Sequence, residues 1–502
     1  MNEIKNPTIL TQSGYVSGLV EQGVNKWLGI RYATPPVGDL RFKRARPIGR
    51  WDGVFEAVKF GPKPVQFDHT YREGKDNGSE DCLTLNIWAP ENAKELPVFV
   101  WLYGGAFAAG SSTDPVYDGT HFAREGVVFV SLNYRVGVFG FYDFSSFATG
   151  QGFDSNCGFS DQIEALIWIR ENIRAFGGDV NNITVAGESA GGSSVLNLLA
   201  APRAKGLFQK GIMQSALPHS ALSREMAKKN LRLFLKAMEL GEREIPWLQQ
   251  AKVPDLVNAA AWLRNNSQYS YPGLYRPGPV IDDLLPEYPV DAIKKGIAKD
   301  IPLIIGTNKD EGSLFVKSKH TRFPNSWEMA GKMFMLNEQL QKLPGIRSYY
   351  QRFKGERRQM REFAKDYAFL RGATEVADVQ RQYASTWMYR FDFETVIGKL
   401  TGKGASHTAE IPFALDNTDK GVARIFLTGT SRKKAGAVRK DMHGAWINFA
   451  KTGNPNSNGL LQWPRYERDS RPTFIFNTRN KIEFDPGKEA MEIWEGLKFY
   501  RE

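Results

Sequence analysis

Continuous runs of apolar residues recur along the chain and predict strands that are buried on both faces. Such runs cover residues 97–102, 127–132 and 301–306, and residues 211–215 and 473–476 are interpreted as shorter strands. A continuous apolar run is typical of a parallel sheet, because helices cover both of its faces. These segments therefore predict the inner strands of one large sheet.

One stretch shows how the strands are connected. Residues 161–173 carry apolar side chains at helical spacing, with Ser160 or Asp161 as the expected N-cap. A short β-branched run, residues 181–185, follows this helix and predicts the next strand. Strand, helix and strand in this order imply parallel pairing with a right-handed crossover.

Together these elements predict an α/β fold with a mostly parallel central sheet flanked by helices. Residues 386–393 alternate like a further strand, and residues 317–383 have a helical, charged and aromatic-rich pattern that predicts a covering region. We find no internal repeat or low-complexity linker, so residues 1–502 are expected to form a single large domain.

Composition narrows the class of protein. With 42% hydrophobic residues the chain can bury a large core, yet no apolar stretch is long enough to span a membrane. The first residues lack the apolar core of a signal peptide, and two cysteines in the whole chain suit a reducing compartment. We therefore expect a cytoplasmic protein without a membrane partner.

The net charge of +11 raises the question of an anionic partner. The basic residues, however, are interspersed with acidic ones, as in residues 354–362, and no nucleic-acid-binding motif is present. A nucleic-acid partner is therefore not expected.

The candidate chemistry centres on a Gly-x-Ser-x-Gly motif, Gly187 to Gly191, with Ser189 in the middle. It lies between a predicted strand and a predicted helix, where a tight turn presents the serine hydroxyl outward and glycines permit close packing. A second glycine pair, Gly104-Gly105, follows the strand at 97–102 and is suited to form the other wall of an oxyanion hole.

A nucleophilic serine needs a histidine base that comes later in the chain. Of the six histidines, only His320, His407 and His443 lie late enough. His443 sits within an amphipathic helix and His320 within a charged run. His407 lies in a glycine-rich loop directly after a strand, where folds of this kind deliver catalytic side chains, so we select His407.

The acid that orients the histidine should follow a strand between these two residues. Asp310 and Glu311 both follow the strand at 301–306, whereas Asp282 and Asp283 follow no clear strand. Local reasoning leaves Asp310 and Glu311 as alternatives.

Several motifs together resemble the type-B carboxylesterase family, which includes cholinesterases, and most closely its bacterial para-nitrobenzyl esterase members. The resemblance covers nearly the whole chain. The matching segments are residues 79–86, 101–107, 161–162, 172–173, 176–179, 187–192, 310–312, 407 with 410–413, and 446–450 with 453–455.

This resemblance implies an α/β-hydrolase fold, and it selects Glu311 as the acid beside Ser189 and His407. It assigns the oxyanion donors to the N–H groups of Gly105, Ala106 and Ala190. This chain departs from many relatives at Tyr103, where they carry histidine, and at Ala216, where they carry glycine. No cysteine precedes Cys82, so the disulfide of many relatives is absent.

We therefore expect a serine carboxylesterase that hydrolyses small-molecule esters through an acyl-enzyme. No metal or organic cofactor is implied, and the expected assembly is a monomer or weak homo-oligomer. The alternatives are a catalytically silent binding module of the same fold and a related amide or carbamate hydrolase.

Overall fold

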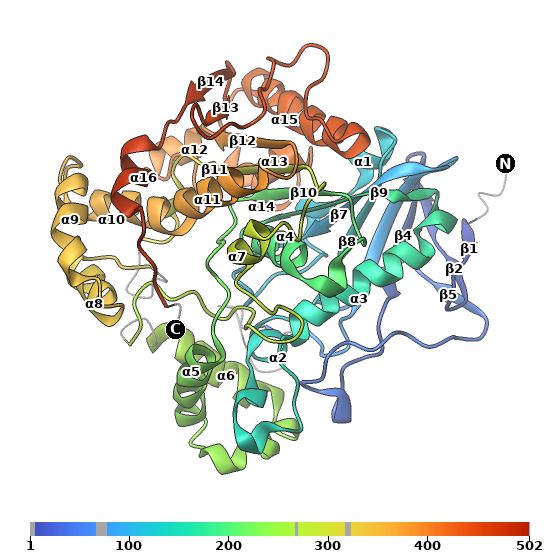
Figure 1. The fold of residues 1–502 in the computed structure, drawn as a ribbon. Coiled ribbons are helices and arrows are strands. Elements are labelled where there is room, and N and C mark those ends of the chain that lie inside the picture. The colour runs from blue at the N-terminus through green and yellow to red at the C-terminus, as the bar shows by residue number, and fades with distance from the viewer. Residues whose placement is uncertain (1–5, 67–77, 267–269, 317–322, 501–502) are drawn as a thin grey trace.

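A computed structural model describes residues 6–66, 78–266, 270–316 and 323–500 (Figure 1). An 11-stranded sheet runs through the middle of the molecule, and a 3-stranded sheet lies near the N-terminus. In spatial order the large sheet contains β14 (Lys481–Phe484), β13 (Pro472–Phe476), β12 (Thr386–Phe391), β11 (Leu303–Asn308), β10 (Lys210–Gln214), β9 (Gly178–Glu188), β7 (Leu96–Leu102), β8 (Val128–Leu132), β6 (Thr84–Pro90), β4 (Val24–Arg31) and β3 (Leu19–Glu21). The small sheet contains β1 (Thr8–Leu10), β2 (Tyr15–Ser17) and β5 (Val54–Glu56).

The strands from β8 through β13 pair in parallel, and antiparallel strands flank them at both edges. The predicted mostly parallel sheet is therefore confirmed. The apolar runs at 97–102, 127–132 and 301–306 correspond to β7, β8 and β11.

Alternate residues of a strand supply two separate cores. On β7, Val98 and Val100 pack in one cluster with α3 (Cys157–Asn172), whereas Phe99 and Trp101 pack in another with α15 (Arg432–Thr452). Because successive side chains point to opposite faces, a strand covered on both faces must be apolar throughout. The same two clusters include α4 (Ala190–Ala200), α7 (Pro289–Lys294) and α11 (Arg371–Gln380) on the first face, and α1 (Thr120–Arg124) and α13 (Ile411–Ala414) on the second.

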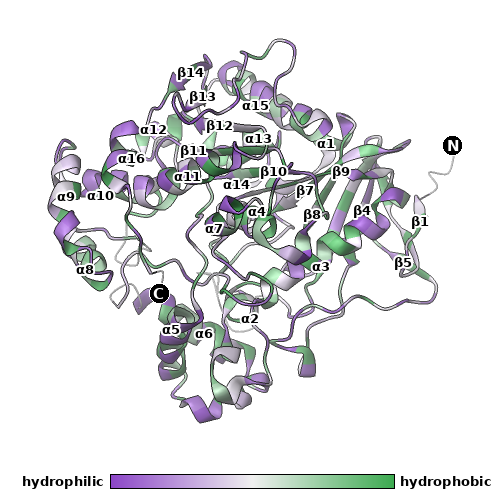
Figure 2. Ribbon diagram, in the orientation of Figure 1, coloured by the Kyte–Doolittle hydropathy of each residue, from purple (hydrophilic) through white to green (hydrophobic). Residues whose placement is uncertain are grey.

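The remaining helices lie around this three-layered centre. Helices such as α5 and α15 carry hydrophobic and hydrophilic residues on different sides (Figure 2). α8, α9 and α10 form a group at one side of the molecule (Figure 1). These outer helices are α2 (Gly137–Phe141), α5 (Arg224–Ala237), α6 (Val253–Asn266), α8 (Trp327–Leu336), α9 (Leu343–Tyr350), α10 (Glu356–Lys365), α12 (Val396–Leu400), α14 (Gly421–Phe426) and α16 (Lys488–Trp494).

One predicted helix boundary is wrong. α3 begins at Cys157 rather than after Ser160 or Asp161, and its N-cap is Asn156 in a left-handed conformation with φ 56°. Asp161 does not cap the helix because its carboxylate pairs with Arg135, with Oδ1 2.6 Å from Nη2. Both side chains are buried, so this ion pair fixes the helix against the segment that follows β8.

Candidate active site

Ser189 stands at a strained corner between β9 and α4. Its φ of 56° and ψ of −118° are unusual for a residue with a side chain, and such strain persists only where surrounding contacts enforce it. A Cβ on Gly187 would lie 2.5 Å from the carbonyl carbon of Gly191, and one on Gly191 would lie 2.0 Å from the oxygen of Leu102. The motif therefore needs both glycines, because strand and helix meet directly there.

Backbone hydrogen bonds hold the corner. The N–H of Ser189 donates to the oxygen of Gln214 over 2.8 Å, and the N–H of Ser193 donates to the oxygen of Ser189 over 2.8 Å. Ser189 is 6% exposed, so it is buried at this corner.

His407 lies beside Glu311 at the carboxyl end of the sheet. Its Nδ1 is 2.5 Å from Oε2 of Glu311, and Glu311 follows β11 after a short turn. The other carboxylate oxygen, Oε1, accepts hydrogen bonds from the N–H of Asn308 over 2.7 Å and from Oγ of Ser215 over 2.6 Å. These contacts leave the far nitrogen of the imidazole, Nε2, to face the serine corner.

The Nε2 atom lies 3.2 Å from Oε1 of Glu188, the residue that directly precedes Ser189. The structure thus brings His407 into contact with Glu311 and places the imidazole beside the residue that precedes Ser189, although these residues are far apart in the chain.

The glycine-rich loop after β7 forms the wall opposite the imidazole. A Cβ on Gly104 would lie 3.1 Å from Cβ of Ser189, so this loop runs directly beside the nucleophile candidate. Gly105 has φ 119°, and a Cβ there would lie 2.1 Å from the oxygen of Ala109. Ala106 also has a positive φ, and Ala190 begins α4, where the first N–H groups have no partner within the helix. Ala190 therefore directly follows Ser189, and Gly105 and Ala106 belong to the loop whose Gly104 lies beside it.

Three buried carboxylates surround the imidazole: Glu188, Glu311 and Glu410. Burial alone would lower the pKa of His407, but the charges of Glu188 and Glu311 and the hydrogen bond to Glu311 raise it to about 9. Burial, together with Glu410 and Glu311, raises the pKa of Glu188 well above its ordinary value, and the imidazole opposes that rise. Protonation of Glu188 and of His407 is therefore coupled.

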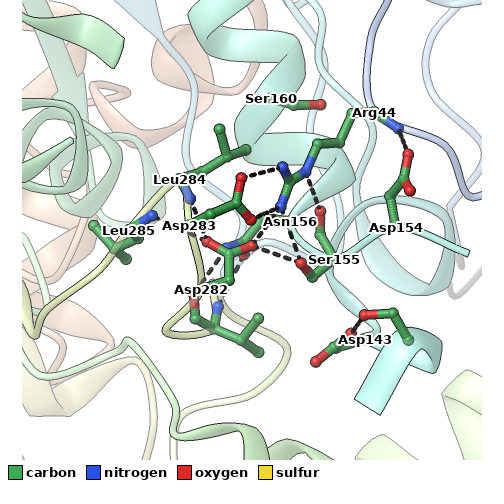
Figure 3. A network of polar contacts seen from close by, with 12 residues as sticks. Arg44, Asp143, Asp154, Ser155, Asn156, Ser160, Asp282, Asp283, Leu284 and Leu285 are labelled. Carbon is green, nitrogen blue, oxygen red and sulfur yellow. Dashed lines mark hydrogen bonds and ion pairs between the residues drawn. The ribbon is translucent and has the colours of Figure 1, made fainter. Parts of the chain in front are cut away.

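The histidines and aspartates that were not selected for the catalytic site have other partners or lie outside the described residues. The Nδ1–H of His443 donates to the oxygen of Ala414 over 2.9 Å, and His320 lies outside the described residues. Asp282 and Asp283 both pair with Arg44, at 2.9 and 2.7 Å (Figure 3). These two carboxylates join the N-terminal segment to the loop before α7.

Asp310, the alternative acid, turns away from the imidazole. Its Oδ2 accepts the N–H of Ala405 over 3.0 Å, and its own N–H donates to the oxygen of Ala405 over 2.9 Å. Asp310 therefore joins the loop of Glu311 to the loop of His407.

Sequence reasoning missed four residues around the imidazole. Glu188 occupies the first x position of the Gly-x-Ser-x-Gly motif, and the motif assigns no role to that position. Glu410 accepts a hydrogen bond from Nδ2 of Asn308, and Gln214 donates to it over 3.2 Å. The missed residues are Glu188, Ser215, Asn308 and Glu410, and only their place after strands or beside a catalytic candidate could have suggested them.

A cleft of about 280 Å³ opens beside these residues. Gly104, Gly105 and Glu188 form one part of its lining, together with Ser406 and Thr408 from either side of His407. The remaining wall is mainly apolar and includes Phe393, Ile411, Phe413, Phe426 and Leu427. The cleft can hold a lipophilic group next to Glu188, the residue that precedes the candidate nucleophile, but Ser189 itself does not line it.

The described residues contain no group of three or more His, Cys, Asp or Glu side chains arranged to hold a metal ion. Within the same residues, no helix combines the length and apolar character that crossing a membrane requires. Cys82 and Cys157 are both buried and both free.

Comparison with known proteins agrees with this geometry. Residues 5–494 match the carboxylesterase family. The chain is 39% identical to para-nitrobenzyl esterase of Bacillus subtilis (strain 168), covering 96% of this chain and 97% of that protein. It is 33% identical to fumonisin B1 esterase of Sphingopyxis macrogoltabida, covering 91% and 84%. The solved structure of a thermophilic PNB esterase superposes with a TM-score of 0.88 at 37% identity, covering 97% and 99%.

These relatives are named as esterases, so a catalytically silent binding module is not favoured. The superposed structure also confirms the α/β-hydrolase fold. The chain belongs to the carboxylesterase family and is a carboxylic ester hydrolase.

Proposed function

We propose that Ser189, His407 and Glu311 form the catalytic triad of this serine carboxylesterase. The observation that carries the proposal is the 2.5 Å contact between Nδ1 of His407 and Oε2 of Glu311, with Nε2 directed at the serine corner. A carboxylate on Nδ1 holds the proton there, so Nε2 is left as the base.

The reaction then proceeds in two halves. His407 takes the proton of Ser189 Oγ as this oxygen attacks the ester carbonyl, and Glu311 stabilises the imidazolium ion that results. His407 next gives the proton to the leaving alcohol, which leaves an acyl group on Ser189. A water molecule repeats the same steps and releases the carboxylic acid.

The N–H groups of Gly105, Ala106 and Ala190 are the proposed donors to the negatively charged oxygen of each tetrahedral intermediate. Loss of one such donor typically costs about 3 kcal/mol of transition-state stabilisation. The fixed, strained loop supports this role, because donors that are already oriented need no rearrangement during the reaction.

The apolar cleft supports neutral, lipophilic esters as the substrate class. Phe393, Phe413 and Leu427 offer an apolar surface to a substrate group, although Asp114 and Lys403 also belong to the lining. We propose that one substituent of the ester occupies this cleft.

The test is hydrolysis of para-nitrophenyl acetate, butyrate and octanoate by the parent protein and by its Ser189→Ala variant. Rapid turnover by the parent alone supports the triad, and the chain-length profile measures the space available to the acyl group. Equal turnover by both folded proteins would exclude Ser189 as the nucleophile. A para-nitroanilide of the best acyl group separates esterase from amidase activity.

We further propose where the protein is located, how its chain is organised and what it assembles with. The two free, buried thiols support a reducing, cytoplasmic location. We also propose that the chain is one domain, acts as a monomer or weak homo-oligomer, and needs neither nucleic acid nor a cofactor. Light scattering with size-exclusion chromatography measures the assembly, and a single calorimetric transition would support one domain.

A further inference from the structure

A basic cleft of about 510 Å³ lies behind the candidate triad. One wall is α10, which belongs to the group of helices at the side of the molecule (Figure 1). The opposite walls are the turn that carries Glu311, residues 309–313, and the loop that leads to His407, residues 398–404. The cleft therefore touches both segments that position the acid and the base.

The lining carries an excess of positive charge. Its basic side chains are Lys309, Lys354, Arg357, Arg358, Arg361, Lys365 and Lys399, and its acidic side chains are Asp310, Glu362 and Glu394.

Each of the three acids already has a partner. Glu394 pairs with Lys309 at 3.1 Å, and Glu362 pairs with Lys365 at 2.7 Å. Asp310 accepts the N–H of Ala405 over 3.0 Å. Three acidic side chains therefore face seven basic ones, and two of the three acids are already paired with lysines of the lining.

The basic side chains repel one another there. Burial and the nearby charge of Arg357 lower the pKa of Arg361 by more than the charges of Asp310 and Glu362 raise it, so its environment disfavours the positive charge. A multivalent anion in the cleft would relieve this repulsion and accept hydrogen bonds from several guanidinium groups at once.

Arg361 joins the cleft to the loop of the base. Its Nη1 donates to the oxygen of Gly402 over 3.0 Å, five residues before His407. On the other side, a Cβ on Gly312 would lie 2.0 Å from the oxygen of Arg361, so the helix rests directly on the turn of Glu311. Arg361 therefore lies against both segments, with its guanidinium group on the loop of His407 and its backbone on the turn of Glu311.

We propose that this cleft binds a multivalent phosphate-type anion and that its occupancy lowers ester hydrolysis by drawing Arg361 away from Gly402. A phosphate oxygen forms a stronger hydrogen bond with a guanidinium group than a neutral carbonyl does, so the anion wins the competition. The loop of His407 then loses one of its anchors. The proposed effect on ester hydrolysis rests on the proposed catalytic roles of His407 and Glu311, whereas the proposed binding of the anion does not.

Binding is tested by calorimetry with inorganic pyrophosphate, on the parent and on the Ser189→Ala variant. We expect both to bind, because the cleft does not include Ser189. The double variant Arg357→Gln/Arg358→Gln should weaken binding about tenfold or more, which corresponds to about 1.4 kcal/mol. The matched control is Lys433→Gln/Lys434→Gln, which removes the same charge from exposed positions of α15 outside the cleft.

The binding measurements decide whether the anion site exists and which ligand it recognises. No binding to the parent, or equal weakening by the cleft and control variants, would overturn the site. Comparison of pyrophosphate with ADP identifies the source of the phosphate group: equal affinity indicates recognition of the diphosphate alone, and tighter binding of ADP indicates a nucleotide.

Regulation is tested by hydrolysis of a neutral ester with and without saturating pyrophosphate. We expect kcat to fall about fivefold with KM nearly unchanged, a coupling of ordinary size for linked sites. Arg361→Gln should lower kcat by itself and should no longer respond to the anion. Unchanged kcat in the occupied parent would exclude regulation, and a failed Ser189→Ala test would remove the proposed function while leaving the binding result intact.

Discussion

Nε2 of His407 lies 3.2 Å from Oε1 of Glu188, which places a second carboxylate on the side of the imidazole that faces Ser189. Two other carboxylates near the imidazole, Glu311 and Glu410, are fully buried. The charges of Glu188, Glu311 and Glu410 all help to hold the pKa of His407 at about 9. The base needs a neutral imidazole, so kcat/KM of the parent should rise with pH through the alkaline range.

Glu188→Gln should move the acidic limb of the kcat/KM profile to lower pH. The Glu188 charge favours the imidazolium ion and raises the pKa of His407, so its removal lowers that pKa and leaves the base neutral at lower pH. The measurement is kcat/KM of a neutral ester from pH 5 to pH 10. An unmoved limb would contradict the electrostatic role of Glu188.

Ser215→Ala removes the hydroxyl that donates to Oε1 of Glu311 over 2.6 Å. The carboxylate keeps its contact with His407 but loses a partner that fixes its rotation, so kcat should fall roughly tenfold with little change in KM. Ser131→Ala is the control, since Ser131 is equally buried but bonds Asn86 away from the site. A similar loss in both variants would indicate general destabilisation instead.

Gly105→Ala should displace the proposed oxyanion loop. A Cβ would lie 2.1 Å from the oxygen of Ala109, and the φ of 119° is unfavourable for alanine. We expect kcat to fall by about 10²–10³, the usual effect of losing an oxyanion donor. Gly49→Ala, where a Cβ meets nothing within 4 Å, should leave kcat unchanged.

Asp161→Asn tests the buried ion pair that anchors α3. Arg135 and Asp161 meet at 2.6 Å with 3% and 0% of their side chains exposed, so the variant leaves an uncompensated buried charge. The free energy of unfolding should fall by about 3–5 kcal/mol in a denaturant titration. Glu242→Gln, which breaks an exposed pair with Arg232, should cost about 1 kcal/mol or less.

The sequence by itself determined the central sheet and the serine corner. Apolar runs such as residues 97–102 predict inner strands, because both faces of β7 are covered and every position must be apolar. The motif around Ser189 predicts its turn, because only glycine fits at Gly187 and Gly191. Both signals are local in the chain.

Only the tertiary structure decided how the residues around the imidazole are arranged. Asp310 and Glu311 are neighbours with the same chemistry, and the sequence segment alone does not separate them. In the fold, Glu311 contacts His407 across 96 positions of the chain, whereas Asp310 bonds Ala405. Glu188 and Glu410 likewise reach the imidazole, and Ser215 reaches Glu311, from separate strands and loops. Such contacts depend on how strands are ordered in the sheet, and side-chain periodicity within a segment carries no information about that order.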